Sequence, residues 1–356
     1  MAFAFRKKTM AGAVVLVTTV SMAIAGCASR DPESANSPSK SGASSAQASS
    51  QQSPSKSPVA TPKGSGGASV PAGLPSGPVP AGTFGVGAAV TKPACAEPPS
   101  NYPPLKVPGT VVKDIDGLEA GTNHGTAADK YVYPASVVNQ WLEKPATQPK
   151  NKKIAFVTFD DGPTTKFTGE QLDNLKKAGA RATFFMIPPQ MRDVNKNMLS
   201  RSLKMGNALA IHSYSHDYKY LYHGSAVDKA KHIGCDWDWA MAQSRAILGS
   251  NYFSSAFRHP GGHMSWTNLS QADAALAKRG VGWIDWNAMS GDADAQRPTT
   301  VPGYLQMVKK SIKESNNPNV VVILNHDTYG KQMTAEAMPS ILAWLKSQGY
   351  ELDVIA

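Results

Sequence analysis

From residue 152 onward, short apolar runs alternate with longer amphipathic segments. This alternation is typical of repeated strand and helix units, in which parallel strands form a sheet or barrel that helices cover. Seven segments are predicted as strands, at residues 154–159, 182–186, 209–212, 256–258, 282–287, 320–324 and 351–355. Helices are predicted between them at residues 168–179, 191–205, 226–248, 267–279, 301–315 and 334–348. The pattern therefore predicts an α/β fold around parallel strands.

The first residues of the chain differ from this pattern. Basic side chains at residues 6–8 precede an apolar stretch over residues 10–25, which ends in small residues before Cys27. This order indicates an export signal, expected over residues 1–26, whose end resembles the processing box of bacterial lipoproteins. The apolar stretch is shorter than the ~20 residues that span a bilayer. We therefore expect a lipid on Cys27 that holds the protein on the outer face of the cytoplasmic membrane, with secretion or an uncleaved anchor as alternatives.

A spacer is expected after the signal. Residues 27–104 are rich in Ser, Ala, Gly, Pro and Gln and poor in large apolar side chains, so they cannot bury enough surface to offset the entropy of ordering the chain. We expect a disordered, semi-extended tether there. Residues 105–150 are expected to be partly ordered and to pack against the folded domain, which is predicted over residues 151–356.

The formal net charge of +10 raises the question of nucleic-acid binding. The basic side chains of the predicted domain are spread thinly, without a basic helix or a nucleic-acid motif. We therefore expect no nucleic-acid partner, and attraction to anionic wall or lipid surfaces explains the charge more simply. A monomer is the expected state.

The chain has three cysteines. If Cys27 carries a lipid, Cys95 and Cys235 remain. In an exported protein this pair could form a disulfide that ties the tether to the folded domain, or it could remain as two free thiols. The sequence leaves both alternatives open.

Polar side chains follow the ends of the predicted strands. In a barrel of parallel strands, active sites form from the loops at the carboxyl ends of the strands. These loops should therefore bring together Asp160 and Asp161 after the first predicted strand, His212 and His216 after the third, Arg258 after the fourth, Asp292 beyond the fifth, and His326 with Asp327 after the sixth.

His212 and His216 are four residues apart, so a helical turn would place both imidazoles on one face, where they could bind one cation. A helical zinc-protease motif requires Glu at position 213, and Ser213 stands there instead, which disfavours that chemistry. Two surface histidines in a loop are the alternative for the pair taken alone.

Asp160 and Asp161 are neighbours, so on an extended backbone their side chains point in different directions. We therefore expect different roles for them. One could complete a His₂Asp metal site, while the other could take a proton from water. A glycosidase pair is disfavoured because its carboxyls flank the cleaved bond at ~5 to 9 Å, which adjacent residues rarely achieve.

Four motifs follow one another along residues 152–356: Thr158-Phe159-Asp160-Asp161-Gly162-Pro163, His212-Ser213-x-x-His216, Arg258-x-Pro260-x-Gly262 and Leu324-x-His326. In this order and spacing the chain resembles the polysaccharide deacetylases, carbohydrate esterase family 4. The resemblance implies a distorted (β/α)₇ barrel and the removal of acetyl groups from N-acetylated sugars.

The resemblance also implies a role for each residue of the site. It makes Asp161, His212 and His216 the ligands of a divalent metal, with zinc the expected ion. It makes Asp160 the general base, which Arg258 would hold ionised and oriented. It makes His326 the general acid and Leu324 one wall of the acetyl pocket.

Two motifs depart from the usual family pattern. Gly261 stands where the family often has Tyr, but the role there is a backbone N–H for the oxyanion, which Gly can provide. In place of the usual fourth motif, Trp286 is followed by a Gly-Asp-Ala sequence containing Asp292. We assign Asp292 as the partner that orients His326, and Trp286 or Trp266 as the substitute for the missing aromatic residue, with a core position as the alternative for either.

The expected substrate is an acetylated glycan polymer. An anchored head on a long tether would face the cell wall, which favours N-acetylglucosamine in peptidoglycan. Chitooligosaccharide, exopolysaccharide and O-acetylated xylan are alternative substrates. A wall-binding module without turnover is an alternative of another class, which the intact base, ligands and acid disfavour.

Replacing Cys27 with Ser should release the protein from membranes into the medium, because the substitution removes the site of lipid attachment. Activity per molecule should stay unchanged, since a flexible tether does not constrain the folded domain. Cell fractionation with immunodetection measures the distribution. A variant that stays with the membranes would contradict lipidation at this residue.

Overall fold

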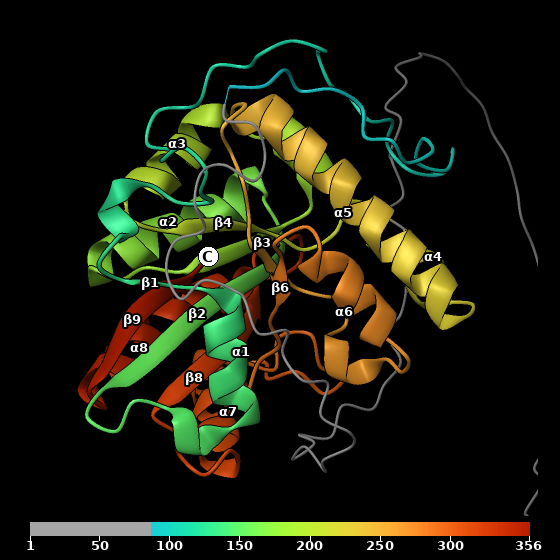
Figure 1. Ribbon diagram of the computed structural model, residues 1–356. Coiled ribbons are helices and arrows are strands. Elements are labelled where there is room, and N and C mark those ends of the chain that lie inside the picture. The colour runs from blue at the N-terminus through green and yellow to red at the C-terminus, as the bar shows by residue number, and fades with distance from the viewer. Residues whose placement is uncertain (1–86) are drawn as a thin grey trace, which may run out of the picture. The chain divides into compact units, whose positions relative to one another are not determined.

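Parallel β-strands form the centre of the fold, and helices pack around them (Figure 1). The structure is a computed structural model that describes residues 87–356. The predicted signal peptide, Cys27 and residues 27–86 of the predicted tether lie outside the described residues. Among residues 87–356, no helix is both long and apolar enough to cross a membrane.

Seven consecutive strands, β2 to β8, are neighbours in the order β7-β8-β2-β3-β4-β5-β6, and all their pairings are parallel. They form the curled sheet of a distorted (β/α)₇ barrel, which confirms the predicted fold. β9 pairs with the amino-terminal half of β2, and β1 pairs with β9. The strands are β1 (Val132–Tyr133), β2 (Lys153–Gly162), β3 (Thr183–Met186), β4 (Ala208–Ile211), β5 (Ala256–Phe257), β6 (Gly282–Trp283), β7 (Ala288–Met289), β8 (Val320–His326) and β9 (Tyr350–Ile355).

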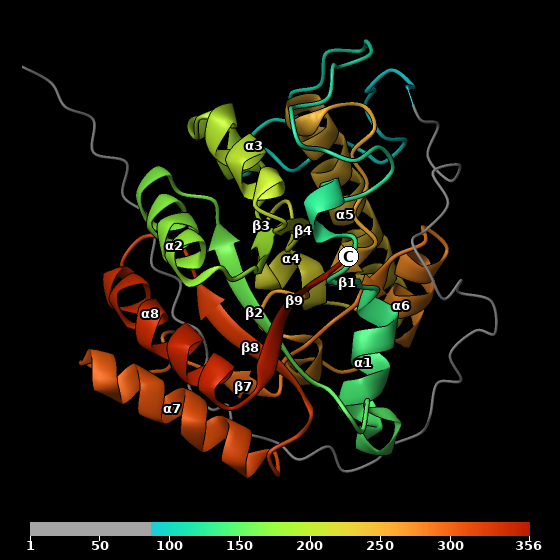
Figure 2. The ribbon, with the colours of Figure 1, turned by 90° about the vertical axis from the view of Figure 1, so that its left-hand side faces the viewer.

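The helices cover the outer side of the strands. Figure 2 shows α2, α8 and α7 side by side next to β2 and β8. Local signals begin several helices: the Thr164 side chain accepts a hydrogen bond from the first turn of α2, and Ser225 and Asp228 form a capping box on α5. The helices are α1 (Ala135–Glu143), α2 (Thr165–Ala178), α3 (Lys196–Lys204), α4 (Tyr218–Tyr222), α5 (Ala226–Leu248), α6 (Ser270–Ala277), α7 (Val301–Glu314) and α8 (Gln332–Ser347).

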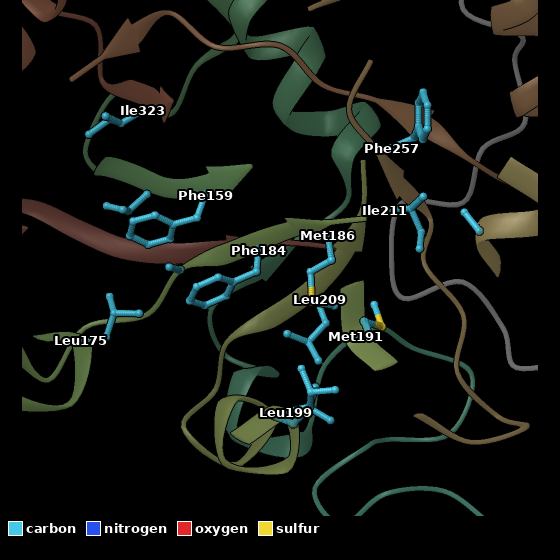
Figure 3. Close-up of a cluster of buried hydrophobic side chains, with 14 of the residues drawn as sticks. Phe159, Leu175, Phe184, Met186, Met191, Leu199, Leu209, Ile211, Phe257 and Ile323 are labelled. Carbon is cyan, nitrogen blue, oxygen red and sulfur yellow. The ribbon is translucent and has the colours of Figure 1, made fainter. Parts of the chain in front are cut away.

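The central strand β2 is buried on both faces, as expected for a parallel strand between helices and a barrel interior. Its side chains alternate between two clusters of buried apolar residues. Val157 and Phe159 pack into the cluster under the helices, where Phe159 stacks on Phe184 of β3 (Figure 3). Ile154 and Phe156 belong to the second cluster, with residues of the neighbouring strands. Burial on both faces fixes the register of β2, and with it the direction of the residues at its carboxyl end.

The segment before the barrel is more closely attached than the sequence analysis expected. Residues 87–104, assigned to the tether, contain no helix or strand, but Val90 is buried and Cys95 forms a disulfide with Cys235 of α5. The structure thus selects the bridged alternative for this cysteine pair. Farther along, β1 and α1 come from residues 105–150, and β1 joins the sheet through β9.

Several predicted elements differ from the observed ones. The predicted helix at 191–205 is a 3₁₀ helix (Pro188–Asp193) followed by α3, and the predicted strand at 282–287 shrinks to β6. β1, β7, α1 and α4 were not predicted. Consequently the seven predicted strands included β9, whereas the seventh strand of the barrel is β7. β1 and β7 have only two residues each, too few to produce a periodic pattern, which explains why these two strands were missed.

Candidate functional site

The polar residues singled out in the sequence meet at the carboxyl ends of the strands. β2 and β8 pair directly there, with Asp160 opposite His326. Short side-chain distances connect all the predicted residues with chemical roles into one site. Asp160 and Asp161 lie near the end of β2, His212 and His216 follow β4, Arg258 follows β5, Asp292 follows β7, and His326 ends β8.

Asp161, His212 and His216 form a group that fits a metal ion. The Asp161 Oδ1 atom lies 3.3 Å from His212 Nε2 and 3.1 Å from His216 Nε2. All three potential ligand atoms lie within 4.8 Å of one another. Asp161 Oδ1 is buried and has no hydrogen-bond partner among residues 87–356, although two imidazole nitrogens are close to it. A carboxylate and two imidazoles that converge without hydrogen-bond geometry are the donor set of an open divalent metal site.

Electrostatics keep the Asp161 carboxylate charged. Burial opposes ionisation, but the neighbouring His216 and His212 outweigh burial and hold the Asp161 pKa well below its usual range. The carboxylate is therefore available as a ligand at neutral pH.

The backbone places these ligands in unusual conformations. Asp161 has φ 68° and His216 has φ 49°, which is the left-handed region that residues other than glycine seldom adopt. The register of β2 against β3 also shifts between Asp160 and Gly162. Such strain is found where the surrounding structure fixes a functional geometry. The two adjacent carboxylates therefore face different partners, as expected, but because of a left-handed backbone at Asp161 and not the extended backbone on which the expectation rested.

His212 and His216 lie in a loop. The expectation that a helical turn brings the two imidazoles together was therefore wrong. Asp236 on the buried face of α5 holds this loop. Its carboxylate accepts hydrogen bonds from Ser213 Oγ and from the backbone N–H groups of Tyr214 and Ser215 at 2.7 to 2.8 Å. Asp236 was not among the predicted site residues, although an Asp between the apolar residues Ile233 and Trp237 on one helix face is a signal of a buried polar role.

Arg258 is fully buried and fixes Asp160. Its Nη1 atom donates to Asp160 Oδ1 at 2.9 Å and to Thr158 Oγ1 at 2.6 Å. Its other donors reach the carbonyl oxygens of Ile284 and Asp285. The charged guanidinium thus has a partner on each side, and the Asp160 carboxylate is held in one orientation.

Asp292 orients His326 through two contacts. One carboxylate oxygen lies 2.8 Å from His326 Nδ1, and the other accepts the His326 backbone N–H at 2.8 Å and the Thr334 hydroxyl at 2.9 Å. Burial opposes charge on the imidazole, but Asp292 and then Asp161 outweigh burial and raise the His326 pKa to about 9. His326 Nε2 points toward the group formed by Asp161, His212 and His216, and lies 3.9 Å from Asp161 Oδ2. A protonated imidazole is therefore available beside the convergent ligands.

The residues predicted to bind substrate surround this group less directly. Leu324 is buried in β8, next to the end of the strand that carries His326. Gly261 has φ 77°, and its carbonyl accepts a hydrogen bond from Ser265. Trp286 is half-buried between the Arg258 guanidinium, 5.7 Å from its ring, and the backbone at Gly262, where a Cβ would lie 2.7 Å from the ring. Trp286 therefore packs against the residues that build the site, Arg258 and Gly262.

Comparisons with known proteins agree with this geometry. A family model described as polysaccharide deacetylase matches residues 147–278. The solved structure of a Streptococcus mutans CE4 esterase is 37% identical, with a TM-score of 0.60, and the match covers 67% of this chain and 98% of that chain.

Curated relatives give the same result. A peptidoglycan-N-acetylglucosamine deacetylase of Bacillus cereus is 28% identical over 205 residues, which are 57% of this chain and 70% of the relative. A bifunctional xylanase/deacetylase of Pseudobutyrivibrio xylanivorans is 30% identical over 210 residues, which are 59% of this chain but only 31% of that protein. The chain belongs to the polysaccharide deacetylases of carbohydrate esterase family 4.

Proposed function

We propose that this protein hydrolyses the N-acetyl groups of N-acetylglucosamine residues in peptidoglycan. The observation that carries the proposal is the convergence of Asp161, His212 and His216 between a buried carboxylate, Asp160, and an imidazole, His326, that is paired with Asp292. This arrangement contains a place for a cation, a proton acceptor and a proton donor within one site. Metal-dependent hydrolysis of an amide uses all three functions.

The metal site would be formed by Asp161, His212 and His216. A bound divalent cation would supply positive charge that favours ionisation of a water molecule and stabilises negative charge on the acetyl oxygen. Zinc is the proposed ion, because two imidazoles and one carboxylate with open positions are a donor set typical of catalytic zinc. The Nδ1 atom of His212 lies 2.9 Å from the Arg258 carbonyl, which leaves its Nε2 facing the other two ligands.

Asp160 would accept the proton of the attacking water. Its Oδ2 atom lies 3.9 Å from His212 Nε2, so this carboxylate borders the metal site without belonging to the ligand group. Arg258 occupies the other carboxylate oxygen and prevents rotation of the side chain. One oxygen therefore remains to take the proton.

His326 would donate a proton to the departing amine. The ring stands beside the ligand group, with Asp292 behind it, so its Nε2 atom is the one that faces the reacting bond. The backbone N–H of Gly261 would stabilise the oxyanion, and Leu324 and Trp286 would border the acetyl group.

Peptidoglycan is the proposed polymer for two reasons. The Bacillus cereus relative is named as a peptidoglycan-N-acetylglucosamine deacetylase, and the expected lipid on Cys27 would place this enzyme on the outer face of the membrane, close to the wall. The xylanase/deacetylase relative makes acetylated xylan the competing substrate.

Acetate release from purified substrates tests the function. The full-length protein should release acetate from peptidoglycan faster than from chitin oligomers or acetylxylan, measured with a coupled acetate assay. A strong chelator should abolish the release of acetate, because it removes the cation from Asp161, His212 and His216. Added zinc should restore the release, because it refills the same site. Full activity with the chelator present would exclude metal-dependent hydrolysis, and faster release from acetylxylan would replace the proposed substrate.

Substitutions of the two adjacent carboxylates should affect the rate and the bound metal differently. Asp160→Asn should keep the metal but lower the rate by about 10² to 10⁴-fold, because an amide cannot accept a proton from water. Asp161→Asn should weaken metal binding, because it replaces a ligand that lies 3.1 and 3.3 Å from the two imidazole nitrogens. Bound zinc is measured by mass spectrometry on the same samples as the rate. Equal metal loss in both variants would show that the roles are assigned wrongly.

The partner of His326 should set the alkaline limb of the pH profile. His326 must be protonated to donate, and Asp292 raises its pKa, so the rate falls as pH rises through that pKa. Asp292→Asn should move the alkaline limb to lower pH, because the imidazolium loses a stabilising charge. The profile of kcat against pH measures this limb.

Asp294→Asn is the matched control for that experiment. It removes a nearby carboxylate that forms no ion pair with His326 in the described part of the chain, so a smaller shift is expected. An alkaline limb that stays in place in Asp292→Asn would show that another group supports His326.

A further inference from the structure

A second group of two histidines and one aspartate lies outside the site described above. His259 and His263 belong to the loop after β5, and Asp273 lies on α6. One ligand atom from each residue lies within 4.8 Å of the other two. The His263 Nε2 atom is 3.1 Å from both Asp273 oxygens, and His259 Nε2 is 4.0 Å from Asp273 Oδ1. The proposed reaction uses none of these side chains.

His259 has a buried nitrogen without a partner. Its side chain is 0% exposed, and its Nε2 atom has no hydrogen-bond partner among residues 87–356. Its other ring nitrogen, Nδ1, lies 3.4 Å from the Tyr222 hydroxyl. If Nδ1 carries the proton and donates it to Tyr222, the lone pair of Nε2 points toward Asp273 and is free to bind a cation. A buried polar atom left without a partner is costly, and a bound ion would remove that cost.

The position of His263 is fixed before any ion binds. Its ring stacks on Trp283, with the centroids 3.8 Å apart and the planes 3° apart. Its backbone N–H donates to Asp285 Oδ1 at 2.8 Å. The ring therefore loses little conformational freedom on binding, which favours affinity.

We propose that His259, His263 and Asp273 bind a divalent transition-metal ion, with Zn²⁺ the best match to their donor set. Ligand atoms of a tetrahedral zinc site with bonds of about 2.0 Å lie about 3.3 Å apart. The observed 3.1 Å between His263 and Asp273 already fits, the 4.0 Å between His259 and Asp273 has to shorten, and the two imidazole nitrogens lie within 4.8 Å of each other. The side chains of His263 and Asp273 are 21% and 28% exposed, so an ion can reach the group from solvent. Water would fill the remaining position.

Such an ion would connect the loop after β5 to α6. Arg258, which fixes Asp160, immediately precedes His259, and Gly261 lies between the two histidines. Binding at this second group would therefore stabilise the loop that presents both residues. Its role would be structural, since among residues 87–356 no hydrogen bond or ion pair joins these three side chains to Asp160 or to the Asp161 ligand group.

Zinc titration of the metal-free, full-length protein tests the proposal. Calorimetry with Zn²⁺ alone should give two equivalents for the natural protein, one for His216→Ala, one for His263→Gln, and none for the double variant. His223→Gln, which replaces an exposed histidine outside both groups, is the matched control and should bind two equivalents. Addition of zinc should raise the melting temperature of His216→Ala but not that of the double variant.

The outcomes separate this proposal from the proposed function. If His216→Ala binds no zinc, or if His263→Gln binds as much as the natural protein, the second group does not hold a metal and His263 and Asp273 form only an ion pair. If the natural protein binds a single equivalent that His263→Gln loses and His216→Ala keeps, the second site stands and the Asp161 site fails. Should His263→Gln not fold when metal-free, Asp273→Asn makes the same test at a more exposed position.

Discussion

The site depends on the buried ion pair between the Arg258 guanidinium and the Asp160 carboxylate. The guanidinium is 0% exposed and joins two parts of the barrel: Thr158 and Asp160 on β2, and the backbone that follows β6. The Arg258 carbonyl also lies 2.9 Å from His212 Nδ1. A charge taken out of water costs several kcal/mol unless close partners compensate it. Asp160 supplies the opposite charge, and three neutral oxygens accept the other donors, so strand ends that are far apart in the sequence are held in one arrangement.

This dependence connects stability with chemistry. Without the Arg258 side chain, the buried Asp160 carboxylate would lose the guanidinium that pairs with it, whereas His212 would keep the backbone carbonyl of residue 258 as a partner. Breaking a buried pair by removing one partner typically costs about 3 to 5 kcal/mol, because the remaining charge is left uncompensated. Replacement by Lys would not restore the arrangement, since one ammonium cannot reach oxygens on both sides of the barrel as a planar guanidinium does.

The barrel and the residues of the site could be predicted from the sequence. The backbone conformations and hydrogen bonds that position these residues could not. Apolar runs such as 154–159 have a strong periodic signal, and polar residues at their ends meet because parallel strands share one edge. The conformations of Asp161 and His216 were not predictable, since a positive φ in residues other than glycine depends on tertiary contacts. The place of Asp236 among apolar residues marks it as buried, but its role does not follow from the sequence: two of its partners are backbone N–H groups, and the sequence does not reveal which of these lack acceptors.

Three carboxylates near the end of β2 show how environment divides one chemistry into different roles. Asp160 meets a guanidinium and Asp161 meets two imidazoles, and the left-handed backbone at Asp161 is what turns these adjacent side chains apart. The third, Asp327, lies behind them against Gly162, where any side chain would collide with its carboxyl group. Burial raises the Asp327 pKa to about 7, opposed by a hydrogen bond from Thr168. The neighbouring Asp161 and Asp160 add to this rise, so near neutral pH Asp327 contributes less than a full negative charge behind the site.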